Sequence, residues 1–461
     1  MSVSHYRQQI ESVVANRKWL VVSDSTVEAY HRADELAGLG ANPLFVLGAF
    51  RGLGRIPVDS PHTACTLGVR GRSSMDTIRG AIAAFRTLPP DVCAQIDRWD
   101  PDRTAKVIGP MWDDDSPVHQ RPVFGARWPQ WQALENKMLC DSIWDVVGIP
   151  RAPALVLPVY QSAIENAHKT LDEGLGTVWA GDNKEGWHGG AEYLRWVRTE
   201  NDFSGSFPFF RSHCDQVRIQ AFMEGIPCSI HGMVFPDAVI AFRPCEMLVF
   251  RRPDSNRLTY AGAATAWDPP QVDREFMRTA AQRVGSHLRA QYGYRGVFTL
   301  DGIMTKQGFL PTELNPRFGA AMRGLTSSLP DLPLFLIHRA LCEGIELDYQ
   351  PRRLEELVLD AAEQHRVAEA RFSLSGHEPV AKQTIHFEYT ATGWEAAPTP
   401  THATVTIGSD GPSTYLKVSI ETSALQPGSS PAPVIAHLAR RTANELGHGL
   451  ADLEAAPDVR T

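Results

Sequence analysis

The hydrophobic and polar positions of the N-terminal part predict a strand, a helix and a second strand. The apolar run KWLVVSD begins at Lys18, a segment with helical spacing ends near Gly38 or Gly40, and a second apolar run follows. Ser25, with Glu28 three residues later, predicts a capping box at the start of this helix. This order of elements predicts a small α/β domain.

The middle of the chain has a longer helical pattern. Its apolar residues recur at helical spacing at Trp131, Leu134, Met138, Ile143 and Val147. Gly148 and Pro150, which follow, predict the end of the helix. A strand, ALVLPV, is predicted from Ala154, and strands alternate with helices from there to about Gln350.

The C-terminal part changes to alternating polar and apolar residues. Beyond Glu378 the segments AKQTIHFEY, HATVTIGSDG and YLKVSIET predict an antiparallel cap, and a linker and a closing helix follow. The stretch from Pro89 to Pro129 is rich in Pro, Asp and Trp, and WDDDSP within it predicts a surface loop. We therefore expect an α/β protein with α+β elements and three regions, 1–127, 128–350 and 351–461.

Composition limits the function classes. The length of 461 residues favours about three domains. The hydrophobic fraction, 43%, is that of a globular protein. A net charge of −8 gives no general electrostatic reason to bind nucleic acid or an anionic membrane. Without a run of about 18 apolar residues or an apolar leader, a soluble cytoplasmic protein is expected.

The seven cysteines are scattered without C-x-x-C pairs, so reduced and packed thiols are expected. Cys214 follows His213, but adjacent residues seldom face one another, and a catalytic pair is the minor alternative.

Candidate chemistry is concentrated in LDGIMTKQGFLPTELNPRFGAAM, which runs from Leu300 to Met322. Two apolar segments flank a predicted three-residue loop, 306–308, and this register sets Asp301 opposite Glu313. Asn315 lies two residues further, on the same face of the strand. Pro311 restricts its strand to an edge or unpaired position.

Two carboxylates facing each other across a strand pair repel unless a cation lies between them. With the amide oxygen of Asn315, Asp301 and Glu313 offer three hard oxygen ligands, which favour magnesium over zinc. The alternative is a solvated face of an ordinary hairpin, on which polar residues also alternate.

The order of these pieces resembles the ATP-grasp superfamily of carboxylate-amine ligases. The similar stretch covers about Trp128 to Met322 and contains a helix with a lysine ending in GIP, a glycine-rich loop, a hinge strand and the hairpin. The resemblance implies the ATP-grasp fold, ATP and Mg²⁺ as cofactors, and Asp301, Glu313 and Asn315 as metal ligands. It also implies that Arg317, in NPR, lies near the reacting phosphoryl or carboxylate group.

The resemblance also assigns nucleotide-binding residues. Lys137 would reach the phosphates, and a flexible loop would close over them; the loop and hinge residues are Gly186, Gly189, Gly190, Gln220, Ala221, Phe222 and Met223. The chain departs from the family pattern at two positions. A second phosphate-binding lysine is absent from TVWAGDN, where the nearest lysine is Lys184. Pro227 occupies the place of an acid on the ribose, which leaves Glu224 as a stand-in.

For the acid substrate, the segment before the hairpin offers several charged residues, and paired guanidinium bonds suit a carboxylate. The candidates are Arg243, Glu246 and Arg257, with Arg323 further on; the alternative is a solvated hairpin with surface charges. LNPRFGAAMRG and the cap are similar to the pheganomycin-type peptide ligases, which implies an amino-acid-like acid joined to the amine of an amino acid or peptide. A phosphotransferase and a non-catalytic ATP-binding module stay open, as does a homodimer.

Overall fold

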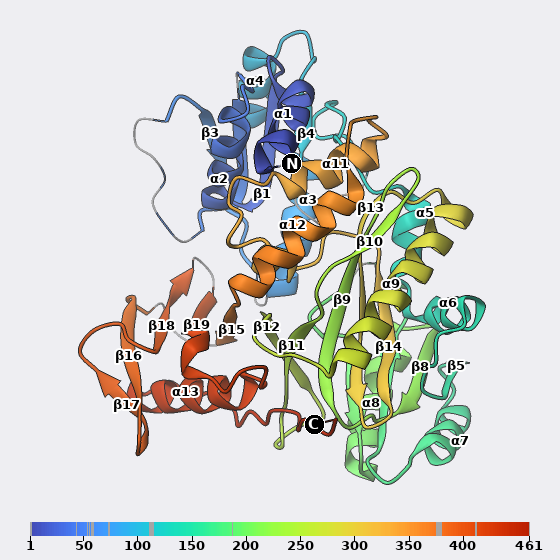
Figure 1. Ribbon diagram of the computed structural model, residues 1–461. Coiled ribbons are helices and arrows are strands. Elements are labelled where there is room, and N and C mark those ends of the chain that lie inside the picture. Colours follow the sequence, from blue (N-terminus) through green and yellow to red (C-terminus); the bar gives the residue numbers. More distant parts are fainter. Residues whose placement is uncertain are drawn as a thin grey trace.

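The computed structural model describes residues 2–42, 44–52, 54, 56, 60–71, 74–109, 115–186, 188–374, 380–410 and 413–460. The first half of the loop predicted at WDDDSP lies outside these residues. The described residues form four sheets, and Figure 1 shows the N-terminal sheet above the central ones, with the C-terminal sheet to one side. No helix in the described part is long and apolar enough to cross a membrane.

The N-terminal sheet is parallel, in the order β3-β2-β1-β4, and has helices on both faces. Trp19 and Val21 pack toward α1 and α2, whereas Leu20 and Val22 pack toward α3 and α4, which explains the continuous apolar run. The predicted strand–helix–strand order is confirmed. The elements are β1 (Trp19–Ser25), β2 (Leu44–Phe50), β3 (Thr63–Thr66), β4 (Lys106–Ile108), α1 (Val3–Val14), α2 (Thr26–Ala37), α3 (Ser74–Arg86) and α4 (Pro90–Trp99).

The helical pattern after residue 128 is not one helix. It divides into α5 (Pro129–Gln132), 3₁₀ turns at Ala133–Glu135 and Lys137–Leu139, and α6 (Cys140–Val147). Asn136 breaks it, because its backbone is extended and its side chain accepts a hydrogen bond from the Met138 N–H at 3.1 Å. Gly148 ends α6 with a φ of 65°, so the predicted end is confirmed and the continuous helix is wrong.

Two antiparallel sheets form the centre of the molecule. The smaller one has the order β5-β8-β6-β7, and α7 and α8 cover one of its faces. The larger has the order β12-β11-β9-β13-β14, with β10 beside β9, and α9 covers one face. The elements are β5 (Ala154–Pro158), β6 (Thr177–Gly181), β7 (Leu194–Val197), β8 (Gln216–Ala221), α7 (Gln161–Leu171), α8 (Glu200–His213), β9 (Ile226–Val234), β10 (Val239–Ala241), β11 (Cys245–Arg251), β12 (Leu258–Ala264), α9 (Gln271–Tyr292), β13 (Gly296–Thr305) and β14 (Gly308–Asn315).

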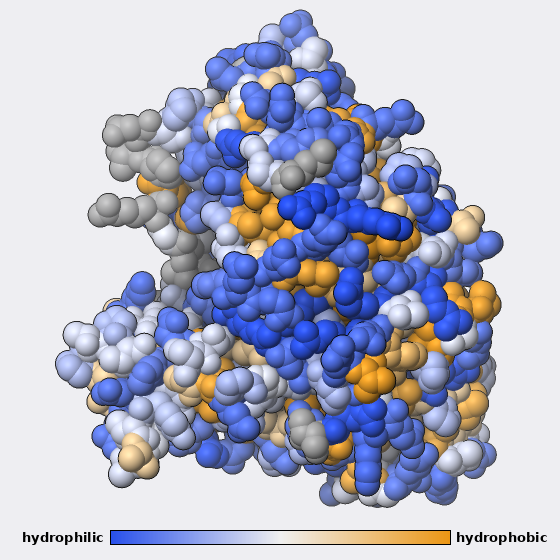
Figure 2. Space-filling model, viewed as in Figure 1, coloured by the Kyte–Doolittle hydropathy of each residue, from blue (hydrophilic) through white to orange (hydrophobic). Residues whose placement is uncertain are grey.

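The C-terminal sheet is antiparallel, as predicted, in the order β15-β19-β18-β16-β17, and α13 packs on it. Two of its strands, β15 and β17, were not predicted. Figure 2 shows a mainly hydrophilic surface on this part. The remaining elements are α10 (Met322–Leu325), α11 (Leu334–Glu343), α12 (Pro351–Gln364), β15 (Ala368–Leu374), β16 (Gln383–Thr390), β17 (Gly393–Ala397), β18 (Ala403–Asp410), β19 (Ser413–Ile420), a 3₁₀ turn (Thr422–Ala424) and α13 (Ala432–Glu445).

Candidate active site

The hairpin of β13 and β14 carries the carboxylate pair. Asp301 lies opposite Glu313 in the register, as predicted. Thr305 pairs with Gly308, so the connection has two residues, 306 and 307, and the predicted three-residue loop is wrong. Gly308 takes a φ of 109°, which suits glycine. Pro311 is tolerated because β14 is an edge strand of its sheet.

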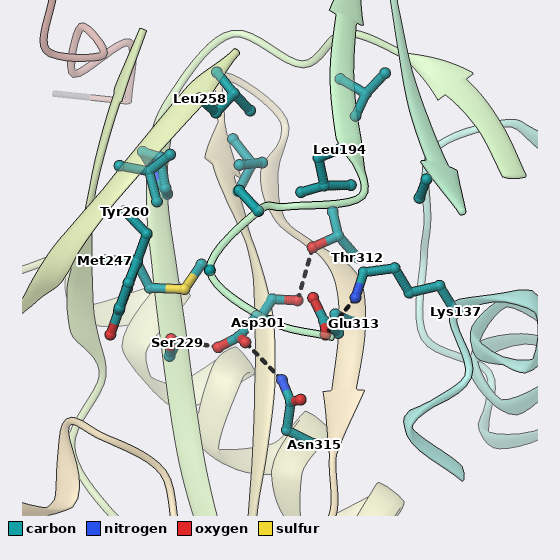
Figure 3. A pocket seen from close by; sticks show the side chains of 18 of the residues that line it. Lys137, Leu194, Ser229, Met247, Leu258, Tyr260, Asp301, Thr312, Glu313 and Asn315 are labelled. Atoms are coloured by element: carbon teal, nitrogen blue, oxygen red, sulfur yellow. Dashed lines mark hydrogen bonds and ion pairs between the residues drawn. The ribbon is translucent and has the colours of Figure 1, made fainter. Parts of the chain in front are cut away.

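Each carboxylate has polar partners at short distance. The Ser229 hydroxyl donates to Asp301 Oδ1 at 2.6 Å, and the Asn315 amide donates to Oδ2 at 2.8 Å. Lys137 Nζ lies 2.7 Å from Glu313 Oε1, and Figure 3 shows these contacts converging on one place. Removal from bulk water and the neighbouring Glu313 raise the pKa of Asp301 to about 6. Lys137 and Arg317 act in the opposite direction, but the pKa of Asp301 stays raised despite these two positive charges.

The donor chemistry fits a hard cation. Asp301 and Glu313 present carboxylate oxygens and Asn315 an amide oxygen, the ligand types that magnesium takes. Among the described residues, no group of three or more His, Cys, Asp and Glu side chains could hold a metal by itself. Asp301, Glu313 and Asn315 offer three oxygens, so a magnesium ion here would take its remaining ligands from water or from a bound molecule such as a phosphate.

A cavity of 320 Å³ lies over these residues, between the two central sheets. Successive side chains of a strand point to opposite faces of the sheet. In β6 and β8, one set packs under α7 and α8, namely Trp179, Val217 and Ile219, so the residues next to them in each strand face the cavity. One end is apolar. The lining there includes Val178, Ala180, Phe222, Met223, Pro227, Met247, Val249, Leu258 and Ile303.

The predicted nucleotide residues divide into two groups. Those that line this cavity are Lys137, Gly189, Gly190, Gln220, Phe222 and Met223. Gly186 lines a neighbouring cavity, and Ala221 and Glu224 are absent from the described lining. The side chain of Ala221 is buried, one strand position from Gln220. Glu224 accepts hydrogen bonds from Arg251, so its carboxylate is engaged by the protein.

Lys184 does not enter the cavity, because its Nζ pairs with Asp215 at 2.7 Å. Another positively charged residue, which the sequence analysis did not name, lines the cavity instead. Arg218 on β8 is buried, lines the cavity beside Ala180 in the register, and donates to Asp141 at 2.7 and 2.8 Å. Its position two residues before Gln220 on the same strand face could have indicated it.

His188 was also missed. Its ring stacks on Tyr193 with centroids 4.2 Å apart, and Nε2 lies 3.0 Å from the Asp182 carbonyl oxygen. Burial, with a further contribution from Lys137, lowers the pKa of His188 below its ordinary value. The ring therefore holds the described residues of the glycine-rich loop, 183–186 and 188–190, beside the cavity as a neutral group.

Arg317 lies at the end of the cavity opposite the apolar one. It donates to Asn315 Oδ1 at 3.1 Å, and its Nε lies 3.2 Å from Glu135 Oε1. Glu135 is itself paired with Arg127. The guanidinium is thus held between the hairpin and the turn that precedes Lys137.

The arginines and the glutamate predicted to hold the acid do not line this cavity. Arg243 is buried, and its two terminal guanidinium nitrogens donate to Glu363 and Asp268, which hold it away from the cavity. Glu246 lies on the opposite face of β11, where it accepts a hydrogen bond from Ser430 at 2.7 Å. Met247 and Val249, its odd-numbered neighbours, face the cavity. The structure thus places Arg243 and Glu246 outside the lining of this cavity, where the sequence analysis had expected residues that hold the acid.

Arg257 and Arg323, also expected to hold the acid, lie outside the lining of this cavity as well. Arg257 is exposed, and its guanidinium donates to the Glu192 carbonyl oxygen at 3.4 Å without lining the cavity. Arg323 has an exposed side chain that pairs with Glu28 on α2. The minor alternative of a Cys214–His213 pair also fails, since His213 contacts Glu185 and Cys214 is buried.

Glu246 leads to a prediction about stability and pH. Burial raises its pKa to about 8 from an ordinary 4.5, so between these values the folded state keeps a proton that the unfolded chain has lost. The contribution of Glu246 to the free energy of unfolding is therefore fully present below about pH 4.5. It is lost as the pH rises toward 8, by about 1 kcal/mol per pH unit. Glu246→Gln should flatten this part of the profile. Urea unfolding from pH 5 to 8 tests it; parallel profiles would contradict the expectation.

Comparison with known proteins agrees with this architecture. No protein-family model and no curated sequence matches the chain. L-amino acid ligase from Bacillus licheniformis superimposes with a TM-score of 0.51 at 10% identity, over 96% of this chain and 98% of that one. A second similar structure is the biotin carboxylase domain of 2-oxoglutarate carboxylase from Hydrogenobacter thermophilus, solved as a dimer with MgADP, ADP and bicarbonate. It superimposes with a TM-score of 0.52 at 13% identity, over 96% of this chain and 91% of that one.

Rhizobium etli pyruvate carboxylase gives a TM-score of 0.55 at 14% identity, over 93% of this chain and 37% of that one. These neighbours are ATP-grasp proteins, and the chain has the ATP-grasp fold. The fold predicted from the hairpin and the pieces before it is confirmed.

Proposed function

We propose that the protein is an ATP-dependent ligase that joins a carboxylic acid to an amine through an acyl phosphate. The observation that carries this proposal is the row of Asp301 and Glu313 between an apolar cavity end and Arg317, with Lys137 beside it. Two negatively charged carboxylates at the centre of a cavity can bind a cation, and that cation can in turn bind a polyphosphate. An amino-acid-like acid and an amino acid or peptide amine are the substrates we infer.

The nucleotide base fits the apolar end, where Phe222 and Met223 lie near the Gln220 amide. The phosphates would then extend toward Lys137 and Arg218, both fixed positive charges on the same cavity. When bound, magnesium on Asp301, Glu313 and Asn315 supplies charge neutralisation at phosphate oxygens.

The reaction needs little covalent chemistry from the protein. A carboxylate oxygen of the acid attacks the γ-phosphorus, the new P–O bond forms, and the bond to ADP breaks with its electron pair on ADP. The amine nitrogen then attacks the acyl carbon, phosphate leaves, and the nitrogen loses a proton. Arg317, Lys137 and Arg218 contribute by positioning and by stabilising negative charge.

ADP release from mixtures of ATP, acids and amines tests the proposal. ADP that requires both acid and amine supports ligation. ADP that requires an acid but no amine supports the phosphotransferase alternative, and ATP binding without ADP supports the non-catalytic module.

Lys137→Ala should weaken ATP binding by roughly ten-fold, the effect of losing one charge-assisted contact. Its ammonium lies 2.7 Å from Glu313 and can reach a phosphate on the same row. Calorimetric titration with ATP and magnesium measures the effect, and Lys184→Ala, which removes a lysine outside the cavity, is the control. Equal affinities of the two variants would remove Lys137 from the phosphate site.

A further inference from the structure

The cavity face of the larger central sheet is arranged in rows across its strands. The register pairs Asp301 on β13 with Ser229 on β9 and with Glu313 on β14, which makes one row. Ile303 and Pro227 pair two residues away, toward the apolar end. Successive rows on one face are roughly 7 Å apart, because each residue of a strand advances about 3.4 Å.

A third row lies on the other side of the carboxylates. Thr299 on β13 pairs with His231 on β9 and with Asn315 on β14, and all three line the cavity. Arg317 borders this row through its bond to Asn315. A molecule that extends from the apolar end across Asp301 therefore points its far end at His231 and Thr299.

His231 and Thr299 differ from the carboxylate row in having unused polar atoms. Their exposed fractions are 1% and 4%, and among the described residues neither His231 Nδ1 nor Thr299 Oγ1 has a hydrogen-bond partner. Buried polar atoms are nearly always paired, since leaving one unpaired costs about 1 to 3 kcal/mol. Two such atoms side by side, on a cavity wall, indicate a place where a bound molecule supplies the partners.

We propose that His231, Thr299 and Arg317 form the subsite for the acid substrate, and that this acid carries an uncharged hydrogen-bonding group beside its carboxylate. The proposal rests on the proposed ligase function, because the acid must lie in line with the terminal phosphate. The class of acid is a 2-hydroxy acid or an N-acylated amino acid. A free amino acid with its ammonium group is disfavoured.

The charges of the cavity give the reason for an uncharged group. Burial, with Arg317 adding to it, lowers the pKa of His231 to about 3, so its ring is neutral and offers one donor and one acceptor. The positively charged guanidinium of Arg317 can pair with the carboxylate of the acid substrate. The acidic residues of the described lining already have partners: Glu192 has Arg79, Asp301 has Ser229 and Asn315, and Glu313 has Lys137. A substrate ammonium would find no spare carboxylate among them.

Gly319 closes this subsite. A Cβ added there would lie 2.6 Å from His231 Nε2 and 2.6 Å from Thr299 Oγ1, so only glycine lets the segment after Arg317 pack this closely. Gly319→Ala should therefore disturb the acid subsite, two rows away from the apolar end of the cavity.

The test uses the full chain with ATP, magnesium and hydroxylamine as a general amine. Matched triplets of acids share one side chain: L-lactate, N-acetyl-L-alanine and L-alanine, and the corresponding sets with larger side chains. We expect ADP release with a hydroxy or acylated member, at least about ten-fold faster than with the free amino acid. A preference for the free amino acid would overturn the proposal.

Variants then locate the subsite. Thr299→Val and His231→Leu should raise the apparent KM for the accepted acid about ten- to a hundred-fold and leave the KM for ATP within about two-fold. Thr442→Val is the matched control, because the Thr442 hydroxyl is also buried and without a partner among the described residues, but on α13. Unchanged KM for the acid, or equal effects on acid and ATP, would reject the subsite while the ligase function stands. No ADP release with any acid would reject both.

Discussion

Glu313→Gln is expected to lower turnover by about a thousand-fold or more while the protein stays folded. A cation site is worth several kcal/mol of charge stabilisation in phosphoryl transfer, and each 1.36 kcal/mol is a factor of about ten in rate. A neutral amide keeps the volume of Glu313 and an acceptor for the Lys137 ammonium, but it removes one of the two carboxylates proposed to hold magnesium. Single-turnover ADP formation at several magnesium concentrations measures the loss.

The matched control is Glu246→Gln in the same sheet. Glu246 lies on the face away from the cavity and bonds to Ser430, so the same chemical change there should leave ADP formation at the wild-type rate near pH 7. Thermal unfolding of both variants checks the fold. Full activity of Glu313→Gln at ordinary magnesium concentration would contradict the metal assignment.

The hairpin was predictable because its information is local. Asp301 and Glu313 are twelve positions apart, and apolar alternation with a glycine at the turn suffices to set them opposite each other. The loop length was wrong by one residue because a bulge after Asp301 compensates for the shorter turn. The broken helix near Asn136 could also have been noticed, since asparagine competes for backbone hydrogen bonds.

The residues of β11 that line the cavity were not predictable, because the orientation of this strand's two faces depends on distant parts of the chain. The C-terminal sheet and α13 cover the even-numbered side chains Leu248 and Phe250, and Glu246 shares that face. A strand's own alternation cannot say which face meets a cavity. His231 and Thr299 likewise become neighbours only through the pairing of β9 with β13, which joins segments far apart in the sequence.

Arg317→Ala is expected to lower kcat by about a hundred- to a thousand-fold, the loss seen when one donor to a developing negative charge is removed. The guanidinium bonds to Asn315 and Glu135 and borders the row beyond the carboxylates, where the transferred phosphoryl group would meet the acid. Affinity for ATP should change little, because in the proposed arrangement the base and the first phosphates would lie toward Phe222 and Lys137, which also line the cavity. The fold should survive, since Arg127 still pairs with Glu135.

Arg317→Lys distinguishes a specific role from a general charge. Lysine keeps the positive charge but loses the planar fork that contacts Asn315 and Glu135 together, so we expect it to recover only part of kcat. Arg323→Lys, on an exposed side chain that pairs with Glu28, is the control and should keep the wild-type kcat. Steady-state kinetics with ATP and acid varied in turn separates kcat from the two KM values. If Arg317→Ala changed kcat no more than Arg323→Lys does, the phosphoryl group would have to be stabilised by Lys137 and Arg218 without Arg317.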